Sequence, residues 1–203
     1  MDAAFYVTAF ATLFVIIDPI GLAPLFVALT QGMAPRARRA IGLRACLVAF
    51  AILLLFGIVG ESVLTFIGIS LPAFRIAGGA LLFLTALDML FERRQERRDG
   101  QAETRADPSV FPLAIPLIAG PGAIATMILL TGQVEGDVAA TAGIFAVMSG
   151  VIGITLVLFL AGGLLERALG RTGINIVTRL LGMLLAALAV QFILTGLSDA
   201  GFV

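Results

Sequence analysis

Two stretches of the chain place prolines, glycines and, in one case, an acid inside long apolar segments. The first, "IIDPIGLAP" (residues 16–24), contains Asp18, Pro19, Gly21 and Pro24. The second, "PLIAGPGAI" (residues 116–124), contains Pro116, Gly120, Pro121 and Gly122. Proline lacks the amide hydrogen that a helix needs, so each stretch predicts an interrupted helix with unpaired backbone groups. Such groups could bind a polar ligand.

Both stretches also suit the start of a new half-helix. Asp18 followed by Pro19 is typical of an N-cap residue with proline at the first helical position, and Gly120 followed by Pro121 repeats this order with a weaker cap. Half-helices over about 19–29 and 121–131 would direct their positive N-terminal ends at the breaks, where the preceding halves end with free carbonyls. The two breaks are expected to face each other, because irregular backbone at membrane depth survives only where protein or water covers it.

Positive and negative helix ends around one small cavity would suit a zwitterion. Its carboxylate could accept hydrogen bonds from the amides of Gly122, Ala123 and Ile124. Its ammonium group could bind carbonyl oxygens near Ile17 or Leu117, with Asp18 nearby. The predicted ligand is therefore a small amino acid.

Three charged residues in or near the apolar segments each have two interpretations. Asp18 could only cap a half-helix, or it could be an ionisable group on a substrate or proton path. Arg75 and Arg179 lie about one turn inside apolar segments. They could extend to the membrane interface, or they could pair with Asp18 or gate the two ends of the path.

The elements that must position these residues are membrane-spanning helices. Of the 203 residues, 60% are hydrophobic and 13% are charged, whereas a soluble domain carries about 25% charged residues. A hydrocarbon core needs roughly 20 apolar residues per helix, and six segments qualify: 4–29, 40–60, 71–91, 109–132, 139–161 and 175–197. Arginine-bearing loops alternate with acidic ones, so the positive-inside rule predicts cytoplasmic arginine loops and both termini outside.

The two halves of the chain resemble each other. Glu61–Gly78 aligns with Glu166–Gly182, so that Arg75 matches Arg179. Each half has three spans, an odd number, so the second half would be inverted relative to the first. We expect a first repeat at 1–91, a cytoplasmic linker at 92–107 and an inverted repeat at 108–203, with the first and fourth spans broken at mid-membrane. Glycines at 78, 79, 162, 163 and 182 are expected at close helix contacts.

Three motifs make the chain similar to MarC family integral membrane proteins: "DPIGLAPLF", "FRIAGGALLFLTALDML" and "PLAIPLIAGPGAIATMILL". The resemblance runs from about Phe10 to Leu197. It implies a six-helix bacterial inner-membrane protein, grouped with lysine-exporter-like transporters, that moves small neutral amino acids such as glycine and alanine by export or proton-linked exchange. It carries over to the eight motif residues named at the start.

Composition argues against several other classes. The chain has no histidine, so a serine protease triad and the commonest metal ligand are both missing. Cys46 is the single cysteine, which excludes a paired-thiol relay. A formal charge of zero gives no basic surface for nucleic acid. We expect no enzyme activity, metal or cofactor. The protein is expected to lie in the lipid bilayer. The sequence is also compatible with a homo-oligomer. A membrane scaffold or regulator that transports nothing, or an exporter of another small metabolite, is the alternative.

Overall fold

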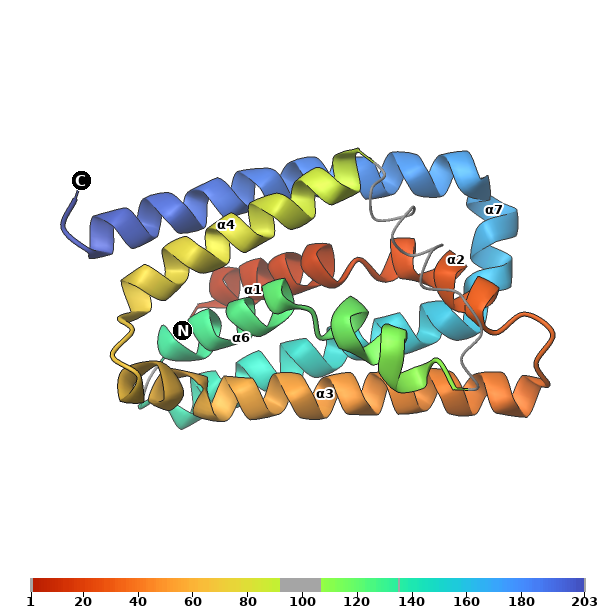
Figure 1. Cartoon of the computed structure of the whole chain (residues 1–203), viewed down its shortest axis with the longest axis horizontal. Helices are drawn as coiled ribbons and strands as arrows, with labels where there is room; N and C mark the ends of the chain where they lie inside the picture. Colours follow the sequence, from red (N-terminus) through yellow and green to blue (C-terminus); the bar gives the residue numbers. More distant parts are fainter. Residues whose placement is uncertain (1, 92–106, 135, 203) are drawn as a thin grey trace.

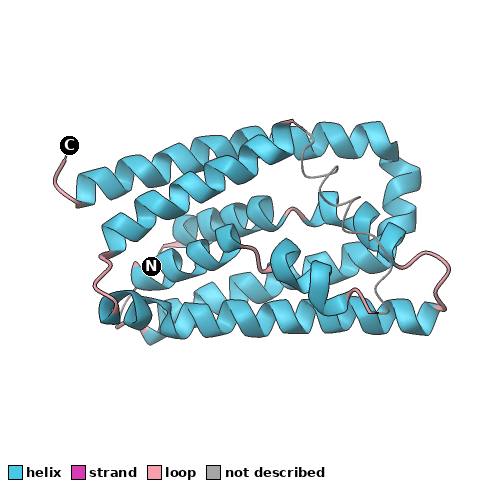
Figure 2. Ribbon diagram, viewed as in Figure 1, coloured by secondary structure: helices cyan, strands magenta, loops and turns pink. Residues whose placement is uncertain are grey.

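The structure, a computed structural model, describes residues 2–91, 107–134 and 136–202. Its helices are α1 (Ala3–Ile17), α2 (Pro19–Leu29), α3 (Pro35–Phe66), α4 (Leu71–Leu90), η1 (Ser109–Ile118), α6 (Pro121–Gly132) and α7 (Val138–Asp199) (Figure 1). Within the described residues every regular element is a helix, as Figure 2 shows. The predicted all-helical fold is thus confirmed. The predicted linker, 92–107, lies outside the described residues except for Asp107.

Five stretches are long and apolar enough to cross a membrane: Ala3–Leu29, Pro35–Phe66, Leu71–Leu90, Val138–Leu164 and Thr172–Asp199. A sixth exists if η1 and α6, which meet at an angle of 55°, count as one bent span. These stretches coincide with the six segments predicted from hydropathy, although α3 extends beyond both ends of the predicted segment 40–60. Length and composition thus give five or six candidate spans.

α7 consists of two helical parts, each with one of these spans, which meet at a kink at Gly170. Gly170 has φ 63° and ψ 171°, a backbone conformation that residues with a side chain rarely adopt. In Figure 1 the chain turns back on itself in this region, so the two parts of α7 run in opposite directions. The loop expected between the fifth and sixth segments is therefore largely helical.

The connections gather at the two ends of the molecule (Figure 1). One end holds the connection between α2 and α3 and the turn within α7; Arg36, Arg38 and Arg39 lie there in the first turns of α3. The other end holds both termini and the two connections after α3 and α6. The acids described at or near these connections are Asp2, Glu61, Asp137 and Asp199. The described arginine-bearing and acidic connections thus lie at opposite ends, and which end faces the cytoplasm stays a prediction.

α4 and the second part of α7 pack against each other at glycines. A Cβ atom on Gly79 would lie 2.8 Å from the Ala189 carbonyl oxygen, and one on Gly182 would lie 3.3 Å from that of Ala86. Gly196 makes a third such contact, 3.0 Å from the Pro72 carbonyl oxygen. Small residues let two helices approach to backbone contact, so the predicted close contact is confirmed at 79 and 182. The prediction was wrong for Gly163, whose Cβ position has no described neighbour within 4 Å.

Candidate functional site

The break between α1 and α2 consists of one residue, Asp18. It has φ 54° and ψ 61°, the left-handed conformation, and is the one non-glycine residue with positive φ in the described part of the chain. Aspartate tolerates this conformation better than most residues do. Its amide donates to the Phe14 carbonyl at 3.0 Å and its carbonyl accepts from Leu22 at 2.9 Å, so it ends one helix and starts the next.

The side chain of Asp18 caps α2. Its Oδ1 accepts a hydrogen bond from the Gly21 amide at 3.0 Å, and the residue is fully buried. A Cβ atom on Gly21 would lie 2.1 Å from Asp18 Oδ2, so the carboxylate occupies the space that a side chain at position 21 would need. Pro19 is buried at the first position of α2, and Pro24 lies half-buried inside the helix. The backbone interruption is therefore confined to Asp18.

The break before α6 is longer and irregular. Phe111 (φ −131°, ψ 123°) and Ile115 (φ −121°, ψ 125°) are extended within η1, and each precedes a proline, which disfavours helical backbone at the residue before it. The backbone hydrogen bonds in η1 join residues five positions apart. For example, the Ala119 amide donates to the Ala114 carbonyl at 2.9 Å. Gly120 then precedes α6, and a Cβ atom there would lie 2.5 Å from the Pro116 carbonyl oxygen. This contact explains the glycine.

The first turn of α6 offers fewer free amides than the sequence predicted. The Ile124 amide donates to the Gly120 carbonyl at 3.0 Å, so it is already hydrogen-bonded within the helix, and its role in binding a carboxylate stays a prediction. The physical reason for this hydrogen bond is that the fourth residue of a helix already reaches the N-cap carbonyl. Gly122 and Ala123, which come earlier in the turn, are both buried.

The two breaks lie near each other. A Cβ atom on Gly122 would be 3.5 Å from Ile16 Cγ2 in α1 and 2.9 Å from Leu82 Cδ2 in α4, so the start of α6 contacts both helices. In Figure 1 both breaks lie near the middle of the molecule's long axis. The structure therefore brings Gly122 close to the residues that precede Asp18. Pro116 and Pro121 are instead exposed.

A buried hydroxyl lies one turn beyond the start of α6. Thr126 is fully buried, and its Oγ1 has no hydrogen-bond partner among the described residues. Thr126 is four residues after Gly122, on the same face, and helical side chains lean towards the N-terminus of their helix. Thr126 therefore lies over the first turn of α6. Thr12 in α1 is also buried.

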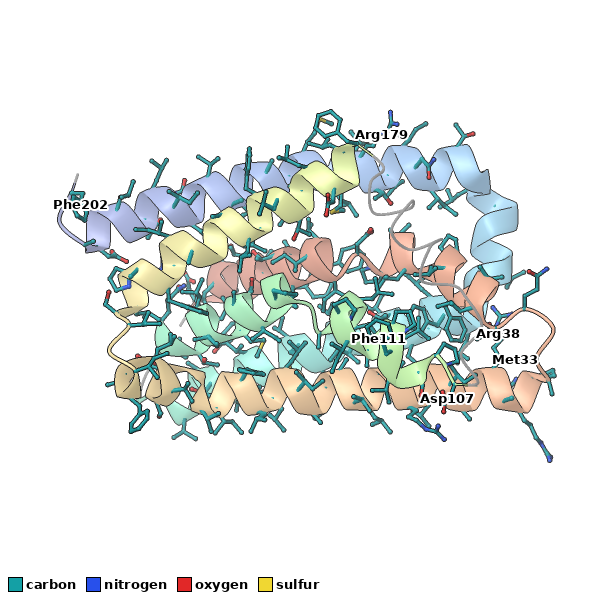
Figure 3. The ribbon with its side chains drawn as sticks, in the orientation of Figure 1. Met33, Arg38, Asp107, Phe111, Arg179 and Phe202 are labelled. Carbon is teal, nitrogen blue, oxygen red and sulfur yellow. The ribbon has the colours of Figure 1, made fainter. Side chains whose placement is uncertain are left out.

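Arg75 and Arg179, for which the sequence allowed two interpretations each, lie far apart along the packed helices α4 and α7. The Arg75 guanidinium is almost fully buried and forms an ion pair with the Asp199 carboxylate at the end of α7. The sequence did not predict this partner, because Asp199 lies just outside the predicted sixth segment. Arg179 is exposed on α7 (Figure 3). Arg75 thus fastens the C-terminal end of α7 to the start of α4.

Two further contacts were missed at the arginine-rich end. The Arg38 guanidinium lies 5.3 Å from the centre of the Phe26 ring, and Phe26 stacks on Phe159 with ring centroids 4.4 Å apart (Figure 3). This stack joins α2, α3 and α7. At the start of η1, the Asp107 carboxylate pairs with Arg44 of α3 and accepts the Ser109 amide at 3.0 Å. Hydrogen bonding from Ser109, helped by the Arg44 charge, holds the pKa of Asp107 below its usual value.

The fold and site define a class: a polytopic helical membrane protein with an acid buried inside its first candidate span. Comparison with known proteins gives the family. The model of MarC family integral membrane proteins matches residues 3–200, and the chain belongs to this family. The predicted resemblance is therefore confirmed over nearly the full length.

Several named relatives match this chain over nearly the full length of both proteins. A UPF0056 membrane protein of Methanocaldococcus jannaschii is 38% identical over 98% of this chain and 99% of its own. The UPF0056 membrane protein YvbG of Bacillus subtilis is 34% identical over 97% and 96%. The UPF0056 inner membrane protein YhgN of Escherichia coli is 35% identical over 94% and 95%. No solved structure matches the chain. These names place the chain among multi-pass integral membrane proteins.

Proposed function

We propose that this protein is a secondary transporter of small neutral amino acids, of the glycine or alanine type, working by export or proton-linked exchange. The proposed binding site lies between the Asp18 break and the first turn of α6. One observation carries the proposal: a Cβ atom on Gly122, at the start of α6, would lie 3.5 Å from Ile16 Cγ2, and Ile16 precedes the buried Asp18 by two residues. A negative side chain and the positive end of a helix are thereby close to each other.

The burial of these groups supports a role beyond packing. A polar group at bilayer depth without compensation costs several kcal/mol, so such groups mark functional paths more often than structural ones. Asp18 is an ionisable residue inside the candidate span Ala3–Leu29. The ammonium of an amino acid would bind near Asp18, and its carboxylate would bind the amides of Gly122 and Ala123. The Thr126 hydroxyl would be a further hydrogen-bonding group.

The proposal includes the inverted-repeat plan and its orientation. Residues 1–91 and 108–203 would form two three-helix repeats of opposite orientation around the two breaks, which would lie at mid-membrane. Both termini would be periplasmic in a bacterial inner membrane, because the arginine-bearing connections would face the cytoplasm. The name of the Escherichia coli relative supports that membrane.

Counterflow in proteoliposomes tests the proposal. Vesicles holding purified protein and preloaded with unlabelled alanine or glycine should accumulate the labelled amino acid from outside. Asp18→Asn keeps the cap and removes the titratable charge, so a drop of tenfold or more would place Asp18 on the path. Asp2→Asn is the matched control, because Asp2 caps α1 through the same type of bond, 3.0 Å from the Phe5 amide, but is exposed.

Each outcome has a defined meaning. Wild-type protein that is folded but shows no counterflow with either amino acid contradicts the proposed substrate class and favours a scaffold or another cargo. Wild-type counterflow that Asp18→Asn leaves unchanged supports transport and assigns Asp18 to capping alone. A loss in Asp2→Asn equal to that in Asp18→Asn would contradict a specific role for the buried acid.

A further inference from the structure

A cavity lies at the acidic end of the molecule, away from the two breaks. It has a volume of about 720 Å³ and is lined by residues at the end of α3, the end of α6 and the start of α7. Its polar residues are Glu61, Ser62, Thr65, Thr131 and Thr141. A second cavity, of about 300 Å³, shares Glu61 and Thr65 with the first. The Glu61 side chain therefore lies between two hollow regions that could each admit a small molecule.

The charges around the larger cavity, which we name the Glu61 pocket, are negative. Glu61 supplies a carboxylate, and its Oε2 lies 3.2 Å from the position of a Cβ atom on Gly132, the last residue of α6. α3 also ends beside the pocket, at Phe66. The C-terminal end of a helix carries partial negative charge on its last carbonyls. Two helix ends and one carboxylate thus favour a cation.

The three threonine hydroxyls of the pocket present oxygen atoms rather than hydrogens. Thr131 donates to the Met127 carbonyl at 2.9 Å, Thr65 to that of Glu61 at 3.0 Å, and Thr141 to that of Asp137 at 2.9 Å. A hydroxyl has one hydrogen to donate, so each of these three oxygens is left with acceptor capacity. The pocket is rich in acceptors, and a ligand with several N–H donors would match it.

The described positive features at this end of the molecule are engaged, including the start of α4, where the Ser70 hydroxyl accepts the Ala73 amide at 3.3 Å. The N-terminus of α7 lies beside the pocket, but Asp137 caps it by accepting the Ala140 amide at 2.9 Å. Arg75, at the same end of the molecule, is paired with Asp199. None of these described groups therefore brings an unpaired positive charge to the pocket.

We propose that the Glu61 pocket binds a small primary ammonium group. The ammonium would lie against the Glu61 carboxylate and donate its remaining hydrogens to the threonine oxygens. Ammonium has three N–H donors, which suits one carboxylate and two hydroxyl oxygens. The pocket is separate from the proposed transport site, because Asp18 lies at the far end of α1, about 20 Å along the helix axis from Ala3. Binding here requires no transport.

Binding measurements on the purified full-length protein in detergent test this proposal. Ethylammonium chloride should raise the thermal unfolding temperature with saturation, whereas sodium acetate, of similar size and opposite charge, should give no saturable shift. Glu61→Gln, which preserves shape and removes the charge, should weaken ethylammonium binding at least tenfold. Asp2→Asn, which removes another acid at the same end of the molecule, should bind as wild type, and this separates Glu61 from the other acids there.

Three results would overturn the proposal. Unchanged binding in Glu61→Gln would show that the carboxylate is not the ligand, and equal saturable shifts with acetate would show that charge is not recognised. If Glu61→Gln does not fold, Thr131→Val decides, because it removes one acceptor from the pocket while keeping the side chain's shape. Thr131→Val with wild-type affinity would then contradict the proposal, and a several-fold loss would support it.

Discussion

The two breaks start from similar sequence motifs but have different structures. At the first break one aspartate in a left-handed conformation joins two regular helices, and the residue is fully buried. At the second break a glycine takes the N-cap position, the preceding helix is irregular, and Ile115 is 42% exposed. The difference follows from the prolines as well as the cap. At the first break a carboxylate cap follows a regular helix, whereas Pro112 and Pro116 disturb the helix before the second break, so the distortion there extends over η1.

The largest difference in stability is expected between a buried side chain next to the first break and an exposed one next to the second. Phe26→Ala in α2 removes a fully buried ring that stacks on Phe159 and lies under Arg38. We expect it to lower the free energy of unfolding by about 3–5 kcal/mol. Ile115→Ala in η1 removes a half-exposed side chain and should cost much less. Unfolding in detergent or mixed micelles compares the two; equal losses would contradict the difference in burial.

Alanine at the glycines of the second break should separate backbone contacts from side-chain contacts. In Gly120→Ala the new methyl would meet the Pro116 carbonyl at 2.5 Å, and backbone atoms have little room to shift. We expect a loss of about 1–3 kcal/mol. In Gly122→Ala the nearest atom is the Leu82 methyl at 2.9 Å, which can rotate away. A Gly122→Ala loss as large as that of Gly120→Ala would show that the start of α6 is more rigid than its contacts indicate.

Substitutions of Asp18 should separate the cap from the charge. Asp18→Ala loses the cap and leaves alanine with positive φ, so we expect a stability loss of about 1–2 kcal/mol. Asp18→Asn keeps both the cap and the tolerance of this conformation and should change stability by less than about 0.5 kcal/mol. Thermal unfolding of the two variants checks this. A large loss in Asp18→Asn would instead indicate that the ionised carboxylate stabilises the fold.

The smallest effect is expected at the surface, where Asp107 fastens η1 to α3. The pKa of Asp107 is lowered in the folded state, so its contribution to stability is present above its unfolded pKa and is lost as the pH falls through the folded one. This contribution to stability is therefore lost only in acid solution, below about pH 4. Asp107→Asn should remove this component of the pH dependence. Because the pair is exposed, the difference from wild type should be small.

Much of the fold follows from hydropathy and proline positions. Apolar segments of sufficient length predicted the candidate spans, and the Asp18–Pro19 pair predicted a helix boundary at that point, where the structure has one. η1 was not predicted, although Phe111 and Ile115 each precede a proline and their extended backbone follows from that position. The partners of Arg75 and Arg38 were not predictable, because they depend on which helices lie side by side. The roles of the candidate site residues stay predictions.

The glycine contacts between α4 and the second part of α7 have a mechanical consequence. Helices that touch through their backbones at three points cannot slide past each other without lifting apart, since the neighbouring side chains and carbonyls block the movement. Arg75 adds a fastening at one end of the same pair. The two helices should therefore move together as one rigid body. We expect any opening of the interior to occur by tilting of this helix pair relative to α1 and α6.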